Sequence, residues 1–128
     1  MKGLRILVLL LLAHEAQARP VTQSYDQMKT LAEQFEQTLT ESEMSKLSLS
    51  YGQPLQAAFP YCAEKTQPRS FEVLSEVNAE GKIVQTWSKT PDEFSSCIAE
   101  QLKNKTIYSA QKKMFYSVLE FNLEAMQQ

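Results

Sequence analysis

The sequence predicts an α+β fold: N-terminal helices followed by a ββαβ unit with a three-stranded antiparallel or mixed sheet and one disulfide. Three observations support this class. Apolar residues recur at helical spacing in the first third of the chain, and two segments of period-two character flank a glycine turn. A helix-start motif then separates this hairpin from a third alternating segment.

Residues 1–18 have the pattern of a secretory signal peptide. Lys2 and Arg5 form a positive region, residues 6–13 are apolar, and Ala16-Gln17-Ala18 is a small-residue cleavage site. The apolar run is shorter than the roughly 20 residues that a spanning helix needs. We therefore expect cleavage, a secreted or periplasmic location and no stable membrane insertion of the mature chain. An uncleaved signal anchor is the alternative.

Cleavage also determines which chemistry remains. It leaves 110 of the 128 residues, enough for one core, and it removes His14, the only histidine. The basic residues fall from 13 to 11 and the acidic residues from 15 to 14, a net charge of −3. We expect no catalytic residues, no cofactor and no metal site, because no imidazole is left. The acidic balance also disfavours binding to nucleic acid.

Residues 19–54 are expected to form a leader and an amphipathic helical region. The leader is Arg19–Gln23, and the first helix begins at Ser24. Its apolar stripe comprises Met28, Leu31, Phe35 and Leu39. Thr40 and Glu43 then predict a capping box for a second helix through Leu47.

Residues 55–128 are expected to form the disulfide-linked domain. A turn at residues 51–54 precedes it. Leu55–Lys65 has helical spacing but contains Pro60, so we expect a short or broken helix whose last turn presents Cys62.

Residues 71–87 predict a β-hairpin. Residues 71–77 and 83–87 are the two strands, and the turn at 78–82 contains Gly81, which can adopt a positive φ.

A helix is predicted from the hairpin to about Lys103. Thr90 as N-cap, Pro91 at the first helical position and Glu93 three residues after the cap mark its start. The inward face comprises Phe94, Cys97, Ile98 and Leu102. Cys97 can therefore meet Cys62, and in an exported chain we expect the pair to be bonded. A reactive thiol pair is the alternative.

The third strand is predicted at Met114–Leu123. Phe115, Leu119, Phe121 and Leu123 lie on one face, and Met114, Tyr116, Glu120 and Asn122 on the other. The tail from Glu124 is expected to fray. The right-handed crossover rule then favours the strand order 2-1-3, with strands two and three as edges.

Three segments, Tyr61–Glu64, Phe71–Val84 and Ser96–Ile98, resemble the two-cysteine variety of the TonB C-terminal domain of periplasmic proteins. The resemblance covers about residues 55–123 and implies a ββαβ fold and a role in the bacterial envelope. Residues 103–108 depart from the family's Trp-x-Phe-x-Pro-like segment, and no anchor or proline-rich spacer precedes the domain. An energy-transducing role is therefore not expected.

The remaining polar side chains are interpreted as surface groups. Ser42 and Lys46 are one helical turn apart, and Glu72, Glu76 and Glu80 follow one strand, where solubility and edge protection explain them.

The expected function is a non-enzymatic interaction with another envelope or secreted protein. Trp87 and Tyr116 are the candidate partner-binding residues, in an exposed strip at a sheet edge that a partner strand joins. In the alternative reading, the N-terminal helix or residues 55–65 cover this face. The alternative function is that of a secreted inhibitor or immunity-type protein blocking an extracellular enzyme.

Overall fold

The computed structural model describes residues 23–126 and confirms the predicted α+β class. Its elements are α2 (Tyr25–Glu36), α3 (Glu41–Ser50), α4 (Gly52–Lys65), β1 (Phe71–Val77), β2 (Ile83–Ser88), α5 (Glu93–Leu102), β3 (Phe115–Phe121) and α6 (Leu123–Met126). The expected signal peptide and residues 19–22 of the leader lie outside the described residues.

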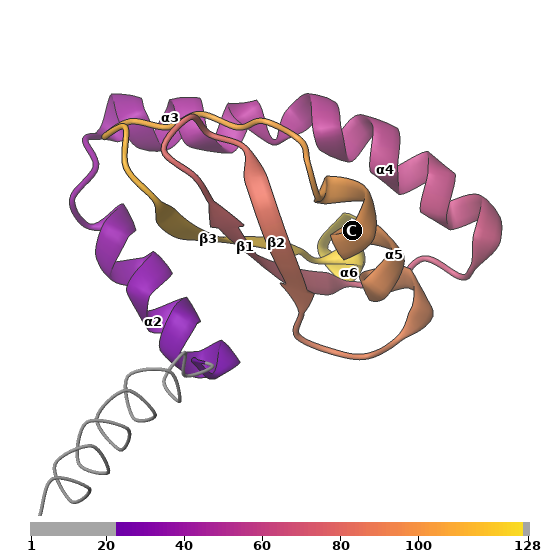
Figure 1. Cartoon of the computed structure of the whole chain (residues 1–128). Helices are drawn as coiled ribbons and strands as arrows, with labels where there is room; N and C mark the ends of the chain where they lie inside the picture. Colours follow the sequence, from indigo (N-terminus) through magenta and orange to yellow (C-terminus); the bar gives the residue numbers. More distant parts are fainter. Residues whose placement is uncertain (1–22, 127–128) are drawn as a thin grey trace, which may run out of the picture.

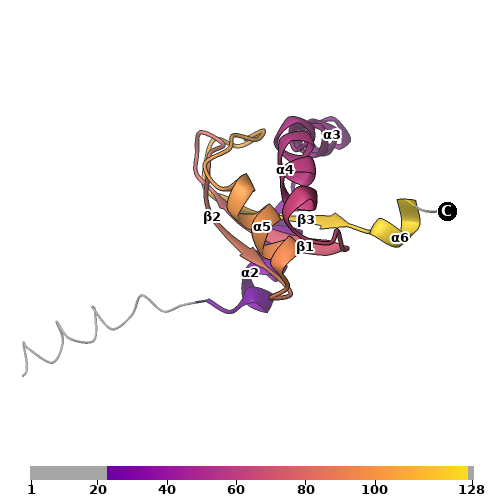
Figure 2. The ribbon, with the colours of Figure 1, turned by 90° about the vertical axis from the view of Figure 1, so that its right-hand side faces the viewer.

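The sheet has the predicted order β2-β1-β3, and β1 is antiparallel to both neighbours. Helices cover both faces. In Figure 1 the long α3 and α4 run above the sheet, and Figure 2, turned by 90°, shows α4 and α5 on one side and α2 on the other. The sheet is therefore the middle layer of three. No helix in the described part of the chain is long and apolar enough to cross a membrane.

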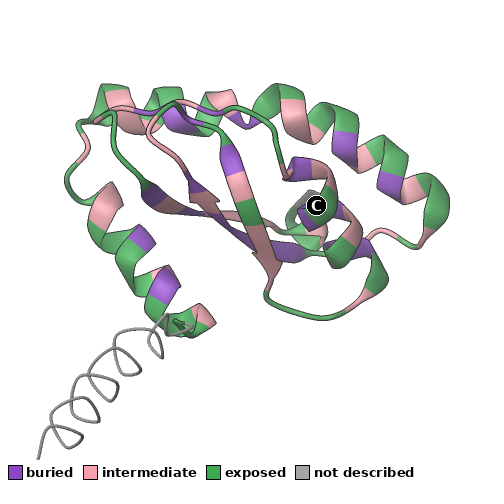
Figure 3. Ribbon diagram, viewed as in Figure 1, coloured by how far each residue is buried: buried purple, intermediate pink, exposed green. Residues whose placement is uncertain are grey.

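The central strand, β1, contributes buried side chains to both faces of the sheet. Phe71, Val73 and Val77 of β1 are buried on the face toward α4 and α5, and Leu74 is buried on the opposite face, toward α2. Figure 3 shows the buried residues concentrated on β1 and on the inner sides of the helices. β1 is therefore buried on both faces, and two of its polar residues, Glu72 and Ser75, are buried with the apolar ones.

A row of hydroxyl side chains crosses the sheet on the α5 side, because Ser75 of β1 lies opposite both Thr86 and Ser117. Thr86 Oγ1 donates to Ala99 O at 2.7 Å, and Tyr51 Oη donates to Ser117 Oγ at 2.6 Å. The outer two strands are thus fastened to the helices above them. Ser75 Oγ is buried and has no hydrogen-bond partner among the described residues.

The two N-terminal helices start as predicted but differ in length and in the buried stripe. Ser24 caps α2, and the Thr40–Glu43 capping box starts α3, which extends to Ser50 rather than Leu47. α2 ends at Glu36, so the expected helical position of Leu39 is wrong. The buried positions of α2 are Met28 and Ala32, whereas Leu31 is 39% exposed. The close approach of helix and sheet selects the small alanine over the neighbouring leucine.

The predicted turn at residues 51–54 and the predicted break at Pro60 are both wrong. Only Tyr51 separates α3 from α4, and its backbone is helical in conformation. Pro54 lies in the first turn of α4, where a backbone N–H has no partner within the helix. Pro60 is exposed, and α4 continues past it to Lys65 with Ala58 and Cys62 buried on its inner side. Tertiary packing therefore outweighs the hydrogen bond that Pro60 removes.

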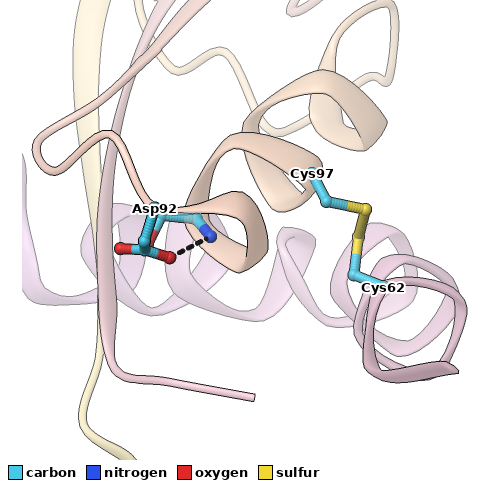
Figure 4. Close-up of a disulfide and its surroundings, with 4 residues drawn as sticks. Cys62, Asp92 and Cys97 are labelled. Atoms are coloured by element: carbon cyan, nitrogen blue, oxygen red, sulfur yellow. Dashed lines mark hydrogen bonds between the residues drawn. A yellow bond between two sulfur atoms is a disulfide. The ribbon is translucent and has the colours of Figure 1, made fainter. Parts of the chain in front are cut away.

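The start of α5 is two residues later than predicted. Asp92, not Thr90, is the N-cap, and its Oδ1 accepts from Ser95 N at 2.8 Å (Figure 4). Thr90 Oγ1 instead donates to Asp92 Oδ2 at 2.6 Å, which orients the capping carboxylate. Hydrogen bonding to the charged form holds the pKa of Asp92 below its usual value despite partial burial.

The predicted disulfide is confirmed. Cys62 in the last turn of α4 is bonded to Cys97 of α5, with the Cα atoms 5.8 Å apart (Figure 4). The bond joins the helix over β3 to the helix over β2. The C-terminal tail differs from prediction, because residues 123–126 form the short helix α6 instead of fraying. Leu123 N donates to Ser70 Oγ at 2.8 Å and fixes this helix to the start of β1.

Candidate functional site

Trp87 and Tyr116 lie on the same face of the sheet but on its two opposite outer strands. Trp87 is opposite Leu74, and Tyr116 is opposite Glu76, so β1 separates them. Both side chains are half-buried. α2 lies on this face and packs on β3 and β1, as the alternative interpretation expects. Tyr116 Oη donates to Gln23 Oε1 at 3.0 Å, and burial followed by the charge of Glu76 raises its pKa.

The outer edge of β2 is paired with the chain's own backbone at its first residue, Ile83, and in the turn that precedes it. Ile83 N donates to Lys105 O, and Asn104 N donates to Ile83 O, both at 2.8 Å. Ile107 N donates to Gly81 O at the same distance. Asn104 has a positive φ of 73°, which turns the chain from α5 into this segment. Residues 104–107 therefore act as a short cover on the β2 edge.

One further backbone donor of β2 is occupied by a local contact. The Thr86 backbone N–H does not donate to β1 and donates instead to Oε1 of the preceding Gln85 at 3.1 Å. A glutamine that occupies its neighbour's backbone donor makes the edge a poorer template for a partner strand.

The outer edge of β3 is open in the sense that no described segment bonds to its backbone, although Phe35 of α2 stacks on Phe115 at the start of the strand. Lys89 N donates to Glu72 O, so the backbone groups of Glu72 point toward β2. Because pairing alternates along an antiparallel strand, residues 71, 73, 75 and 77 bond to β3. The register then assigns Ser117 and Leu119 to β1 and directs the N–H and C=O groups of Tyr116, Val118 and Glu120 outward. No other described segment bonds to these outward groups.

An apolar groove lies beside this open edge, on the α4 side. It has a volume of about 330 Å³. Its lining residues are Gly52, Leu55, Gln56 and Phe59 of α4 with Phe121 of β3. Phe59 packs edge-on against Phe121, with ring centroids 5.2 Å apart, so the floor of the groove is continuous with the core.

α2 lies beside the same edge on the other face of the sheet, and the carboxylate of Glu72 bonds to two of its side chains. Glu72 accepts from Tyr25 Oη at 2.7 Å and from Lys29 Nζ at 3.0 Å. Burial opposes ionisation of Glu72, but these two donors outweigh it and hold its pKa below the usual value. Burial and the bond to this carboxylate raise the pKa of Tyr25. The expectation that Glu72 is a solvated surface group is therefore wrong, since its side chain is only 10% exposed.

The other sequence candidates remain isolated. Ser42 and Lys46 are exposed on α3, where Lys46 Nζ lies 5.7 Å from the centre of the Tyr108 ring. Glu80 is exposed in the hairpin turn. In residues 23–126, no group of three or more His, Cys, Asp or Glu side chains is placed to hold a metal ion.

Sequence reasoning placed β3 at an edge but missed what surrounds it. The Tyr25–Glu72–Lys29 cluster has no local signature, because its members are distant in sequence. The groove residues of α4 are close in sequence, but Phe121, which completes the groove, is distant from them. The alternation in residues 114–123 does identify Glu120 and Tyr116 as one face of this strand. No protein-family model matches the chain, and comparisons with curated proteins and with solved structures also found no match.

Proposed function

We propose that this chain is an exported, non-enzymatic protein-interaction module of the bacterial envelope or periplasm. In this proposal, an extended segment of another envelope or secreted protein adds to the outer edge of β3. The observation that carries it is the contrast between the open edge of β3 and the occupied edge of β2. Strand addition draws its affinity from backbone hydrogen bonds, and β3 directs the N–H and C=O groups of Tyr116, Val118 and Glu120 outward.

Two features support the compartment. The Cys62–Cys97 disulfide is typical of proteins that fold in an oxidising environment. Residues 1–18 have the composition of a signal peptide. The likeness to the TonB C-terminal domain points to the same compartment, and the ββαβ order with two cysteines agrees with it. Membership of that family is part of the proposal.

Site-specific crosslinking in cells tests the function. A photoreactive amino acid replaces Glu120 on β3 in one strain and Lys89, the residue that follows β2, in another. Both positions are exposed, and each lies on or beside an outer strand. We expect a discrete crosslinked partner from position 120 and none from position 89. Equal crosslinking from both positions, or none from either, would contradict the β3-edge proposal.

The identity of the captured partner separates the two functional classes. An envelope protein without enzymatic activity agrees with the interaction module. A hydrolase that the purified protein inhibits at nanomolar concentration would instead assign the chain to the secreted inhibitors.

A further inference from the structure

The two walls of the β3 edge, formed by α4 and α2, differ in chemistry, and this difference constrains what can bind there. A strand added to β3 has side chains that point alternately to the two faces of the sheet. One set faces α4, and the other faces α2. This alternation holds for parallel and antiparallel addition, so the side-chain pattern of the partner follows from the two walls alone.

The α4 wall is apolar. Side chains of an added strand on this face lie beside Leu119 and Phe121 and beneath Leu55 and Phe59. Leu55 and Phe59 are only partly buried by the chain itself. A valine, leucine or isoleucine in the groove removes further apolar surface from water and needs no polar partner.

The α2 wall is acidic. Glu120 on β3 is exposed on this face, and Glu33 and Glu36 lie on α2. These carboxylates are close enough to affect one another: burial raises the pKa of Glu36, and the negative charges of Glu33 and Glu120 raise it further.

Two cations lie near this cluster, Lys29 and Lys89, and both charges act on Glu72. Lys29 is bonded to Glu72 at 3.0 Å, and its charge also attracts Glu33 and Glu120. Among the described residues, no salt bridge forms to Glu33, Glu36 or Glu120.

We propose that the segment that adds to β3 alternates apolar residues with lysine or arginine, the apolar side chains entering the α4 groove and the cations facing Glu120 and α2. This inference rests on the proposed function and specifies the partner for the same site. A cation directly opposite Glu120 lies at a Cβ separation of roughly 5 Å, within the range in which opposite charges on neighbouring strands attract. Glutamate or aspartate in that position meets like charge.

Synthetic peptides test the pattern on the folded domain. The probe is a nine-residue peptide of alternating valine and lysine, and the matched control alternates valine and glutamate. A third peptide is the lysine probe with N-methylated backbone nitrogens, which cannot donate to β3. Dissociation constants come from nuclear magnetic resonance titrations that also locate the shifted amides.

We expect the lysine peptide to bind at least tenfold more tightly than the glutamate peptide, with the largest shifts at residues 116–120. The N-methylated peptide is expected to lose binding. Added salt weakens the preference for lysine, because the carboxylates are exposed and screened.

Variants of the protein test separately what the acidic wall, the apolar groove and the backbone of β3 contribute to peptide binding. The double substitution Glu33→Lys and Glu120→Lys is expected to reverse the charge preference. Gln56→Trp is expected to weaken binding of both peptides by filling the groove, with Gln56→Ala as its control. Val118→Pro removes an outward N–H and leaves the β1 ladder intact, because residue 118 does not bond to β1.

The outcomes distinguish the inference from the function on which it rests. If the two peptides bind equally, and the charge reversal has no effect, the alternating apolar and basic pattern is overturned. The function survives this result if Val118→Pro still abolishes crosslinking from position 120. If Val118→Pro affects neither crosslinking nor peptide binding, while its unfolding transition is unchanged, the proposed function fails.

Discussion

The two edges of the sheet belong to strands of similar length but differ in what occupies their outward backbone groups. The β2 edge is paired with residues 104–107 at Ile83 and in the preceding turn, and Gln85 occupies the backbone donor of Thr86. The β3 edge has no such cover among the described residues and is flanked by an apolar groove on one face and carboxylates on the other. Strands protected from association show several such devices, and strands used for association lack them.

The two edges also differ in the helices that pack beside them. α5 packs on β2 and β1, and Asp92 caps it. α4 lies over the β3 side and is joined to α5 by the disulfide. The helix beside the covered edge, α5, follows β2 directly in the chain. The helices beside the open edge, α2 and α4, are distant from β3 in sequence. Four experiments test this difference between the two edges.

Loss of the disulfide has the largest expected effect. The double variant Cys62→Ser and Cys97→Ser frees α4 from α5, and a loop of this length gives a loss of about 3–4 kcal/mol in the free energy of unfolding. Urea titration measures the loss. Treatment of the native protein with a thiol reductant is expected to reproduce it. Ser96→Ala, at an exposed position beside Cys97, is the control. An unchanged urea midpoint would show that packing alone holds the groove.

Gly81→Ala is expected to displace residues 104–107, which cover the β2 edge. Gly81 has a φ of 92°, and a Cβ there would collide with Ile107 O, the carbonyl in the covering segment. Strain at this φ together with the collision gives an expected loss of about 3 kcal/mol.

Gly52→Ala is the matched control, because a Cβ at Gly52 meets no atom within 4 Å. We expect it to change stability by no more than about 1 kcal/mol, in the stabilising direction. If both substitutions had equal effects in urea titrations, the close approach at Gly81 would not be what closes the β2 edge.

Amide hydrogen exchange compares the two edges without substitution. Ser117 and Leu119 donate to β1, whereas Tyr116, Val118 and Glu120 point outward. We expect the first set to exchange at least about 100-fold more slowly than the second, a difference of about 2.7 kcal/mol in the free energy of opening. On the opposite edge, Ile83 is expected to be protected by its bond to Lys105. Uniform protection along β3 would mean that its edge is covered.

The pH dependence of stability tests the wall formed by α2 and has the smallest expected effect. The native pKa of Glu72 lies below the unfolded value, so the native state binds fewer protons. Its contribution is present above about pH 5 and is lost as the pH falls through the native pKa. Glu72→Gln is expected to lower stability by about 1 kcal/mol at neutral pH and to flatten the acid limb of the stability curve.

Glu76→Gln is the control for this pH experiment, since residue 76 lies on the same face of β1. Tyr25→Phe removes one donor to Glu72 and is expected to weaken the acid dependence in part. If Glu72→Gln and Glu76→Gln gave the same stability curves between about pH 3 and 7, the Glu72 cluster would not fasten α2.

The elements with strong local signals were predictable. The capping box at Thr40 and Glu43, the hairpin around Gly81 and the alternation from residue 114 each depend on neighbours within a few positions. The disulfide followed from the compartment and from the inward face of Cys97. One error arose where packing opposed propensity, because Pro60 stays inside α4. Another arose from competing caps: α5 begins after Asp92 because its carboxylate, oriented by Thr90, makes the better cap.

By itself the sequence determined the α+β class, the strand order and the cysteine pair, because periodicity, capping and handedness act over short stretches of chain. Only the tertiary structure decided that residues 104–107 cover β2, that Glu72 binds Tyr25 and Lys29, and that α4 forms a groove with Phe121. These contacts join residues from about 20 to almost 70 positions apart. Their formation depends on how the helices settle on the sheet, which no local pattern encodes.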